Sequence, residues 1–161
     1  MKKAFKATAA VLVLLLALAA LFACVQKGEV SGDSMTLVLD DQNSDPVVIQ
    51  VDLNAMSYNE ETGLMNVLQS LRLQEKLDYS ASDSGYGAYL TAVGGLSEDA
   101  AAGRYISVYT SVEKDKATFE GAENYQFLSN EGSVICYPSG VGASAMSIED
   151  GCVIVITYIT Y

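Results

Sequence analysis

The sequence contains no histidine among its 161 residues, and this absence excludes several classes of active site. A Ser-His-Asp triad, a Cys-His pair and a histidine-ligated metal site all require an imidazole. Acid–base chemistry would then depend on carboxylates, and the acidic stretches at residues 97–99 and 148–150 are typical of solvated turns. Because no catalytic motif accompanies them, we expect a protein that is not an enzyme and has no metal site.

Basic residues are also scarce, with nine Lys and Arg against 20 Asp and Glu, and the net charge is −11. Loss of Lys2, Lys3 and Lys6 with an N-terminal signal would lower the net charge to −14. A surface of this sign repels phosphate groups, so we expect no nucleic-acid partner. The acidic residues are spread along the chain, which favours solubility as their role.

The first 23 residues have the layout of a secretory signal peptide. Lys2, Lys3 and Lys6 form a basic start, residues 11–18 are apolar, and small residues follow. A permanent membrane helix is the alternative, but the apolar stretch is short for one. The pattern therefore predicts export, with residues 1–23 removed.

A cysteine stands at the end of this segment, in the tetrad "LFAC". This tetrad resembles the lipobox of bacterial lipoproteins, in which the cysteine is lipidated and becomes the new N-terminus. The resemblance implies that acyl chains on Cys24 anchor the protein on the extracytoplasmic side of the bacterial cell membrane. Each buried methylene of such a chain contributes about 0.8 kcal/mol. A chance cysteine in an apolar run is the alternative.

Two further cysteines, Cys136 and Cys152, lie in neither a CxxC motif nor a zinc-site spacing. They are 16 residues apart, on strands that we expect to be neighbours. A disulfide between them could therefore form after export. Two buried free thiols, packing as small apolar groups, are the alternative.

Residues 24–34 are polar and contain glycine, as in a short tether, and we expect one domain over residues 35–161. The domain begins with two β-rich runs, at residues 35–40 and 47–53. The second run alternates apolar and polar positions, as in a half-buried strand. Together the runs predict a hairpin.

The loop of this hairpin has the D-x-N-x-D spacing that begins a calcium loop, at Asp41, Asn43 and Asp45. However, Pro46 stands where an EF-hand loop requires glycine, and no helices flank it. A solvated turn is the prediction.

The next unit is an amphipathic helix that begins after Thr62, a residue suited to cap it. Its apolar positions follow the i, i+3, i+4, i+7 spacing and are Leu64, Val67, Leu68 and Leu71. A helix of about 13 residues is long enough to cover one face of a sheet.

Further strands are expected at residues 88–93, 104–112 and 133–138, with a turn at Gly94-Gly95 after the first. The polar segment 113–132 is long for a bare loop and could carry a short hairpin of its own.

The stretch "CVIVITYIT" at residues 152–160 is apolar on both of its faces. A strand of this kind is covered on both sides. We therefore predict an interior strand of the sheet, with the turn at Asp150-Gly151 leading into it.

The order of these units resembles the transcobalamin-like C-terminal domain family. The motifs are the strand pair, the "TGLMNVL" helix, "GYGAYLTAVGGL", the core strands and "IEDGCVIVITY". The matching residues are Thr62, Gly87, Tyr89, Thr91, Val93, Gly95, Asp150 and Gly151. The resemblance covers residues 36–161 and implies an α+β fold, a β-grasp-like mixed sheet packed on one main helix. The family's tryptophan on its middle core strand is missing, and Tyr105 or Tyr109 would replace it.

In the vertebrate vitamin B12 carriers of this family, the domain closes over cobalamin together with a helical barrel. The resemblance thus implies a membrane-anchored extracytoplasmic binding lipoprotein for cobalamin or a related corrinoid. The candidate ligand-binding residues are Tyr86, Gly87, Tyr89, Gly95, Tyr109, Tyr137, Gly140 and Gly142. Their rings would supply flat apolar surface and the glycines close backbone approach. Two alternatives stay open. The tyrosines could be core residues, and the domain could bind a surface protein through a sheet edge or its loops, as an adhesion module without a small ligand.

Overall fold

The computed structural model describes residues 33–85, 87–118, 123–129 and 132–161. The predicted signal peptide and Cys24 lie outside these residues, as does most of the predicted tether. Nine strands occur in the described part: β1 (Ser34–Leu39), β2 (Val47–Asp52), β3 (Tyr79–Ser84), β4 (Gly87–Val93), β5 (Leu96–Ser97), β6 (Arg104–Thr110), β7 (Tyr125–Ser129), β8 (Gly132–Pro138) and β9 (Val153–Thr160). Within the same residues, the α-helix is α2 (Leu64–Leu73), and the 3-10 turns are η1 (Asn54–Met56), η2 (Ala100–Ala102) and η3 (Glu113–Asp115). None of the helices described has the length and apolarity of a membrane crossing.

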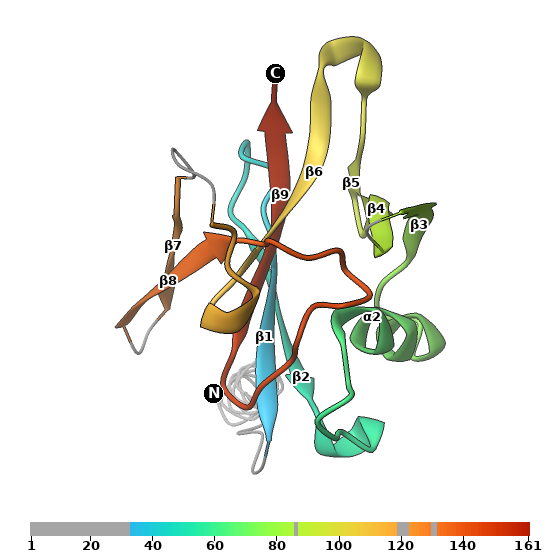
Figure 1. The fold of residues 1–161 in the computed structure, drawn as a ribbon, viewed down its shortest axis with the longest axis vertical. Coiled ribbons are helices and arrows are strands. Elements are labelled where there is room, and N and C mark those ends of the chain that lie inside the picture. Colours follow the sequence, from blue (N-terminus) through green and yellow to red (C-terminus); the bar gives the residue numbers. More distant parts are fainter. Residues whose placement is uncertain (1–32, 86, 119–122, 130–131) are drawn as a thin grey trace, which may run out of the picture.

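The main sheet has six described strands in the order β2-β1-β9-β6-β8-β7, and a smaller sheet has the order β3-β4-β5. Strands β1 and β9 pair in parallel, whereas the other pairings are antiparallel. In Figure 1, β1, β9 and β6 run through the centre, with the β7–β8 hairpin on one side and α2 with the smaller sheet on the other. The predicted mixed sheet with one main helix is confirmed.

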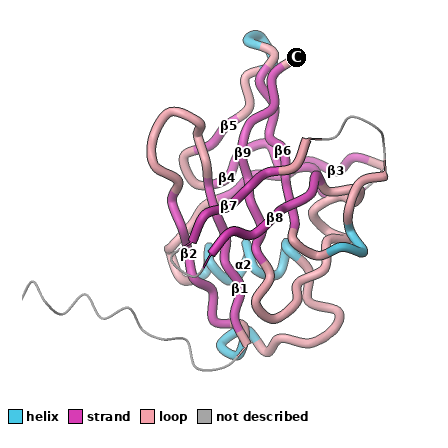
Figure 2. Tube along the Cα trace, turned by 90° about the vertical axis from the view of Figure 1, so that its left-hand side faces the viewer, coloured by secondary structure: helices cyan, strands magenta, loops and turns pink. Residues whose placement is uncertain are grey.

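Strand β9 is an interior strand, as its sequence predicts. It pairs with β1 through Thr36↔Val153 and its neighbours, and with β6 along the whole of that strand. Its alternate residues fall in two separate apolar clusters, because successive side chains of a strand point to opposite faces. Ile154 and Ile156 lie on the helix side, and Val153 and Val155 lie under the β7–β8 hairpin, which faces the viewer in Figure 2.

The turn before β9 is fixed to the start of β1. Gly151 has φ +71°, a conformation that favours glycine, and its N–H donates to the Ser34 carbonyl at 2.7 Å. The Asp150 carboxylate accepts from the Ser34 N–H at 2.8 Å. The "EDG" motif therefore forms the predicted turn and also sets the register of two neighbouring strands.

Helix α2 buries Leu64, Val67, Leu68 and Leu71 against the main sheet. Each such side chain contributes about 1.5–3 kcal/mol by leaving water. The predicted cap is wrong by one residue. Gly63 caps the helix and donates its N–H to Asn66 Oδ1 at 2.9 Å, whereas the Thr62 hydroxyl accepts from the Asn59 N–H in the preceding turn.

Cys136 and Cys152 are both free thiols in this structure, so the disulfide considered above is not formed. Cys136 lies in β8 and Cys152 directly precedes β9, and these two strands are not neighbours, because β6 lies between them. Moreover, Cys152 belongs to the helix-side cluster and Cys136 to the cluster under the hairpin. Burial raises the pKa of each thiol to about 11, so neither is a thiolate nucleophile near neutral pH.

Candidate functional site

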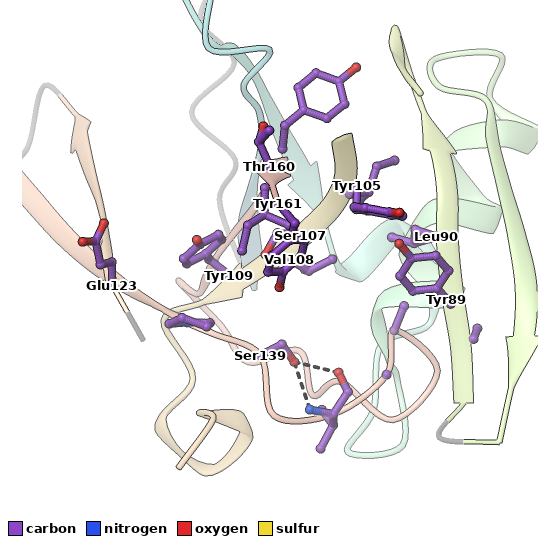
Figure 3. Close-up of a pocket in the computed structure, with 18 of the residues that line it drawn as sticks. Tyr89, Leu90, Tyr105, Ser107, Val108, Tyr109, Glu123, Ser139, Thr160 and Tyr161 are labelled. Atoms are coloured by element: carbon purple, nitrogen blue, oxygen red, sulfur yellow. Dashed lines mark hydrogen bonds between the residues drawn. The ribbon is translucent and has the colours of Figure 1, made fainter. Parts of the chain in front are cut away.

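An open cleft of about 1150 Å³ lies between the smaller sheet and the β6–β9 end of the main sheet. The loop that follows β8 forms its floor in Figure 3. The lining residues come from six segments that are distant in sequence. They are Gln42, Ala88, Tyr89, Leu90, Tyr105, Ile106, Ser107, Val108, Tyr109, Glu123, Pro138, Ser139, Val141, Gly142, Ala143, Tyr158, Ile159, Thr160 and Tyr161.

Five of the described tyrosines line this cleft, from β4, from β6, and from β9 with the residue after it. Two of them, Tyr105 and Tyr161, are paired with ring centroids 6.0 Å apart and a tilt of 56°. Tyr109 is paired with Tyr125 of the β7–β8 hairpin at 5.9 Å. Tilted aromatic pairs of this kind are favourable and fix the ring planes. The cleft therefore offers flat apolar surface with hydroxyl groups at its margin.

The hydroxyl groups of Tyr89 and Tyr158 are already bound within the protein. Tyr89 donates to a carboxylate oxygen of Glu98. Burial, and then this hydrogen bond, raise the pKa of Tyr89 well above its ordinary value, so the group stays protonated. Tyr158 accepts from the Ser97 N–H at 2.9 Å, and the Arg104 guanidinium lies 4.6 Å above its ring. These contacts within the protein hold two rings of the cleft in place.

The floor loop is held by hydrogen bonds to three elements. Its Ser139 N–H donates to the Val108 carbonyl at 2.9 Å, and its Ala143 N–H donates to the Ala88 carbonyl at 2.9 Å. The third attachment is the buried Asp115 carboxylate of η3, which accepts from the backbone N–H and the hydroxyl of Ser147. The loop is thus a preformed part of the cleft.

The cleft contains little that could perform chemistry. Glu123 is the charged residue among the described lining residues, and no lysine or arginine is present there. Within the described part of the chain, no group of three or more Cys, Asp or Glu side chains could hold a metal ion. The arrangement is suited to binding an apolar or aromatic group rather than to acid–base work.

Three of the predicted ligand-binding residues line the cleft, namely Tyr89, Tyr109 and Gly142. Gly87 lies next to it, and its φ of +106° and a distance of 2.6 Å from an added Cβ to Ser144 Oγ explain the need for glycine. Tyr86 is outside the described residues.

The other three predicted residues, Gly95, Tyr137 and Gly140, are not among the cleft's lining residues. Gly95 lies in the turn between β4 and β5, with open space where an added Cβ would lie. The ring of Tyr137 has the Lys116 ammonium 3.9 Å above it, and an added Cβ on Gly140 would lie 3.0 Å from the Lys116 carbonyl. Both residues therefore pack the η3 region.

Three tyrosines of the cleft, Tyr105, Tyr158 and Tyr161, were not predicted as ligand-binding residues. A signal for Tyr105 is present, because it alternates with Ser107 and Tyr109 along β6 and so shares their face. For Tyr158 and Tyr161, the apolar pattern of the C-terminal stretch predicts only burial.

The loop with calcium-like spacing is a hydrogen-bonded turn, as predicted. The Asp41 carboxylate accepts from the N–H groups of Asn43 and Ser44, each at 2.9 Å, and from the Ser44 hydroxyl. These hydrogen bonds hold the pKa of Asp41 below its ordinary value. The carboxylate therefore stabilises the β1–β2 turn.

No family model matches the sequence, and no curated protein matches it. Solved structures do match the fold. One is a Ruminococcus gnavus protein described as a candidate metal-binding protein, with a TM-score of 0.53, 14% identity, and coverage of 81% of this chain and 99% of that one. Another is haptocorrin in complex with Cbi, with a TM-score of 0.50, 12% identity, and coverage of 86% of this chain.

The chain is similar in fold to haptocorrin. The match spans 28% of the haptocorrin chain, so it concerns one region of that protein. At 12% identity the likeness concerns the fold alone. The predicted resemblance is therefore supported for the fold, and the ligand is a separate question.

Proposed function

We propose that this chain is a membrane-anchored extracytoplasmic binding lipoprotein whose tyrosine-lined cleft takes a flat, largely apolar ligand. The first candidate is cobalamin or a related corrinoid. The observation that carries this proposal is the cleft itself, with five tyrosine rings at one site and two of them fixed in advance. The similarity in fold to haptocorrin, which was solved with Cbi bound, supports the choice of ligand class.

The mode of binding follows from the chemistry of the cleft. No imidazole is available anywhere in the chain, so a corrinoid would be held through its ring and side groups and not through its metal. One open domain leaves part of such a ligand in water, whereas small-ligand sites usually bury most of it. We therefore expect modest affinity.

Titration of the purified protein with cobalamin, followed by visible absorbance and calorimetry, tests this proposal. We expect saturable binding. The substitution Y161A should weaken it about tenfold, because it removes a ring contact that contributes about 1.4 kcal/mol to the free energy of binding. Tyr161 is 88% exposed, so its loss should leave the fold intact.

The matched control is L128A, an apolar β7 side chain that is 73% exposed and is not among the lining residues. This variant should bind like the unchanged protein. Absence of binding at about 1 mM cobalamin, or equal affinity of both variants, would contradict the proposal.

The anchor is tested separately at Cys24. In cells, the protein should partition with membranes as a cleaved, lipidated chain that begins at residue 24, and C24S should shift it to the soluble fraction. The reason is that acyl chains, at about 0.8 kcal/mol per buried methylene, supply the attachment. Mass spectrometry provides the check, since an uncleaved chain in the membrane would support a permanent membrane helix instead.

A further inference from the structure

Strand β6 has an unpaired edge inside the cleft. On one side it pairs with β9 from Arg104 to Thr110, but on the other side β8 reaches only Tyr109 and Thr110. The stretch before Tyr109 therefore faces the cleft without a neighbouring strand, and Ile106, Ser107 and Val108 are lining residues. An open strand edge presents backbone donors and acceptors to whatever lies beside it.

Hydrogen bonds at the two ends of β6 show which backbone groups face the cleft. The Gly103 carbonyl accepts from the Tyr161 N–H, and the Ser111 N–H donates to the Val153 carbonyl. Odd-numbered residues of β6 therefore direct their backbone groups toward the β9 side. Since these directions alternate along a strand, the even-numbered residues direct theirs toward the cleft.

Most of the cleft-facing groups already have partners. Arg104 exchanges two backbone hydrogen bonds with Asp99, each 2.9 Å long. The Ile106 N–H donates to a Glu98 carboxylate oxygen at 3.4 Å, and the Val108 carbonyl accepts from the Ser139 N–H at 2.9 Å. The Ile106 carbonyl and the Val108 N–H have no partner among the described residues.

These two groups form an acceptor–donor pair on either side of Ser107. In a parallel sheet, one residue of the added strand donates to the carbonyl before its opposite residue and accepts from the N–H after it. The pair thus matches one extended peptide residue opposite Ser107. The cleft has space for its flanking residues, because about 1150 Å³ exceeds the roughly 300–1,000 Å³ of an ordinary small-molecule site.

The charge and side chains of the cleft indicate the chemistry of the segment. Glu123 is the charged lining residue, Glu98 lies at the edge, and the whole chain carries a net charge of −11. An acidic segment would be repelled. The tyrosine rings favour apolar side chains.

We propose that the open edge of β6 binds an extended, neutral or basic segment of a partner protein by parallel strand addition. One residue of that segment pairs with the Ile106 carbonyl and the Val108 N–H, and its neighbours pack on the cleft tyrosines. Strand addition to an exposed sheet edge is an established mode of peptide recognition. The inference does not depend on corrinoid binding, although both ligands would occupy the same cleft and compete.

Amide hydrogen exchange of the unchanged protein, measured by NMR, tests the free state and the bound state. In the free protein the Val108 amide should exchange fast, whereas the Tyr109 amide, which pairs with β9, should be protected. The probe is the blocked peptide acetyl-Lys-Val-Tyr-Val-Lys-amide. Its binding should slow exchange at Val108 about tenfold or more, because the amide gains a hydrogen bond.

Three comparisons make the assignment specific. The same peptide with an N-methyl group on its tyrosine should bind about tenfold more weakly, because it cannot donate to the Ile106 carbonyl. A peptide with glutamate in place of both lysines should also bind more weakly. The variant V108P should lose peptide binding, whereas V108T, which keeps the N–H, should retain it.

Unchanged Val108 exchange at about 5 mM peptide overturns the proposal, as does equal binding of the N-methylated peptide. If V108P fails to fold, the exchange and N-methyl measurements still decide the question. Failure of the cobalamin titration would not alter these results, since they report on one backbone amide.

Discussion

Removal of residues 153–161 is expected to abolish folding. Strand β9 lies between the β1–β2 hairpin and β6 in the main sheet and pairs with both β1 and β6, so the strand pairing of the two halves runs through it. Four of its consecutive residues, Val153 to Ile156, are buried in the two clusters on either face. Without this strand both clusters lose their centre, and two sheet edges become unpaired.

Circular dichroism and thermal melting provide the measurement. The truncated protein should lack the cooperative transition of the full chain. A milder test is I154A, at a position with 0% exposure, which should lower the free energy of unfolding by about 2–5 kcal/mol.

The control is V47A, at a position of β2 that is 58% exposed. This substitution should change the free energy of unfolding by no more than about 0.5 kcal/mol. A truncated protein that keeps a native spectrum and a cooperative melt would contradict the assigned role of β9.

The second large effect is expected at Asp115, a residue that is 6% exposed. It accepts from the Ser147 N–H at 2.5 Å and from the Ser147 hydroxyl at 3.3 Å. Substitution D115A would leave that N–H without its partner, which costs about 1–3 kcal/mol. Because the same loop forms the floor of the cleft, ligand affinity should fall with stability.

Denaturant unfolding of D115A, together with the cobalamin and peptide titrations, is the measurement. D115N should recover part of the loss, since an amide oxygen can still accept from the Ser147 N–H. The neighbouring exposed residue Glu113 supplies the control, and E113A should behave like the unchanged protein. Full stability of D115A would contradict the role assigned to this carboxylate.

The parts of the fold that follow strong local patterns were predictable from the sequence. The β1–β2 hairpin and α2 have the apolar periodicity of their structures, β9 has the continuous apolar run of an interior strand, and each is confirmed. Strand β3 was missed, because four of the six residues in its "YSASDS" sequence are serine or aspartate and the segment has no clear apolar pattern. It forms because β4 supplies hydrogen-bond partners along its length.

The helix cap depended on a contact distant in sequence. Thr62 is the better cap by residue type, but an added Cβ on Gly63 would lie 3.1 Å from the Met146 carbonyl. The floor loop therefore approaches the start of the helix so closely that the position favours glycine, which has no Cβ. Local preference cannot include such a contact.

The cleft could be predicted only in part for a similar reason. Tyr89 and Tyr109 were found through a family resemblance and the aromatic character of their strands. Tyr105, Tyr158 and Tyr161 join them because β9 lies beside β6, and that strand order is set by the whole fold. The unpaired edge at Ile106 and Val108 likewise results from β8 ending its pairing early.

The parallel pairing of β1 with β9 also affects when the protein can fold. Partners such as Thr36 and Val153 come from segments that the ribosome makes early and late. The centre of the main sheet therefore cannot assemble on the nascent chain before residues 153–160 emerge. Contacts of such long sequence separation form slowly, which lengthens this unfolded interval. Until then β1 and β6 each have an open edge, and open strand edges on an unfinished chain are sites of aggregation.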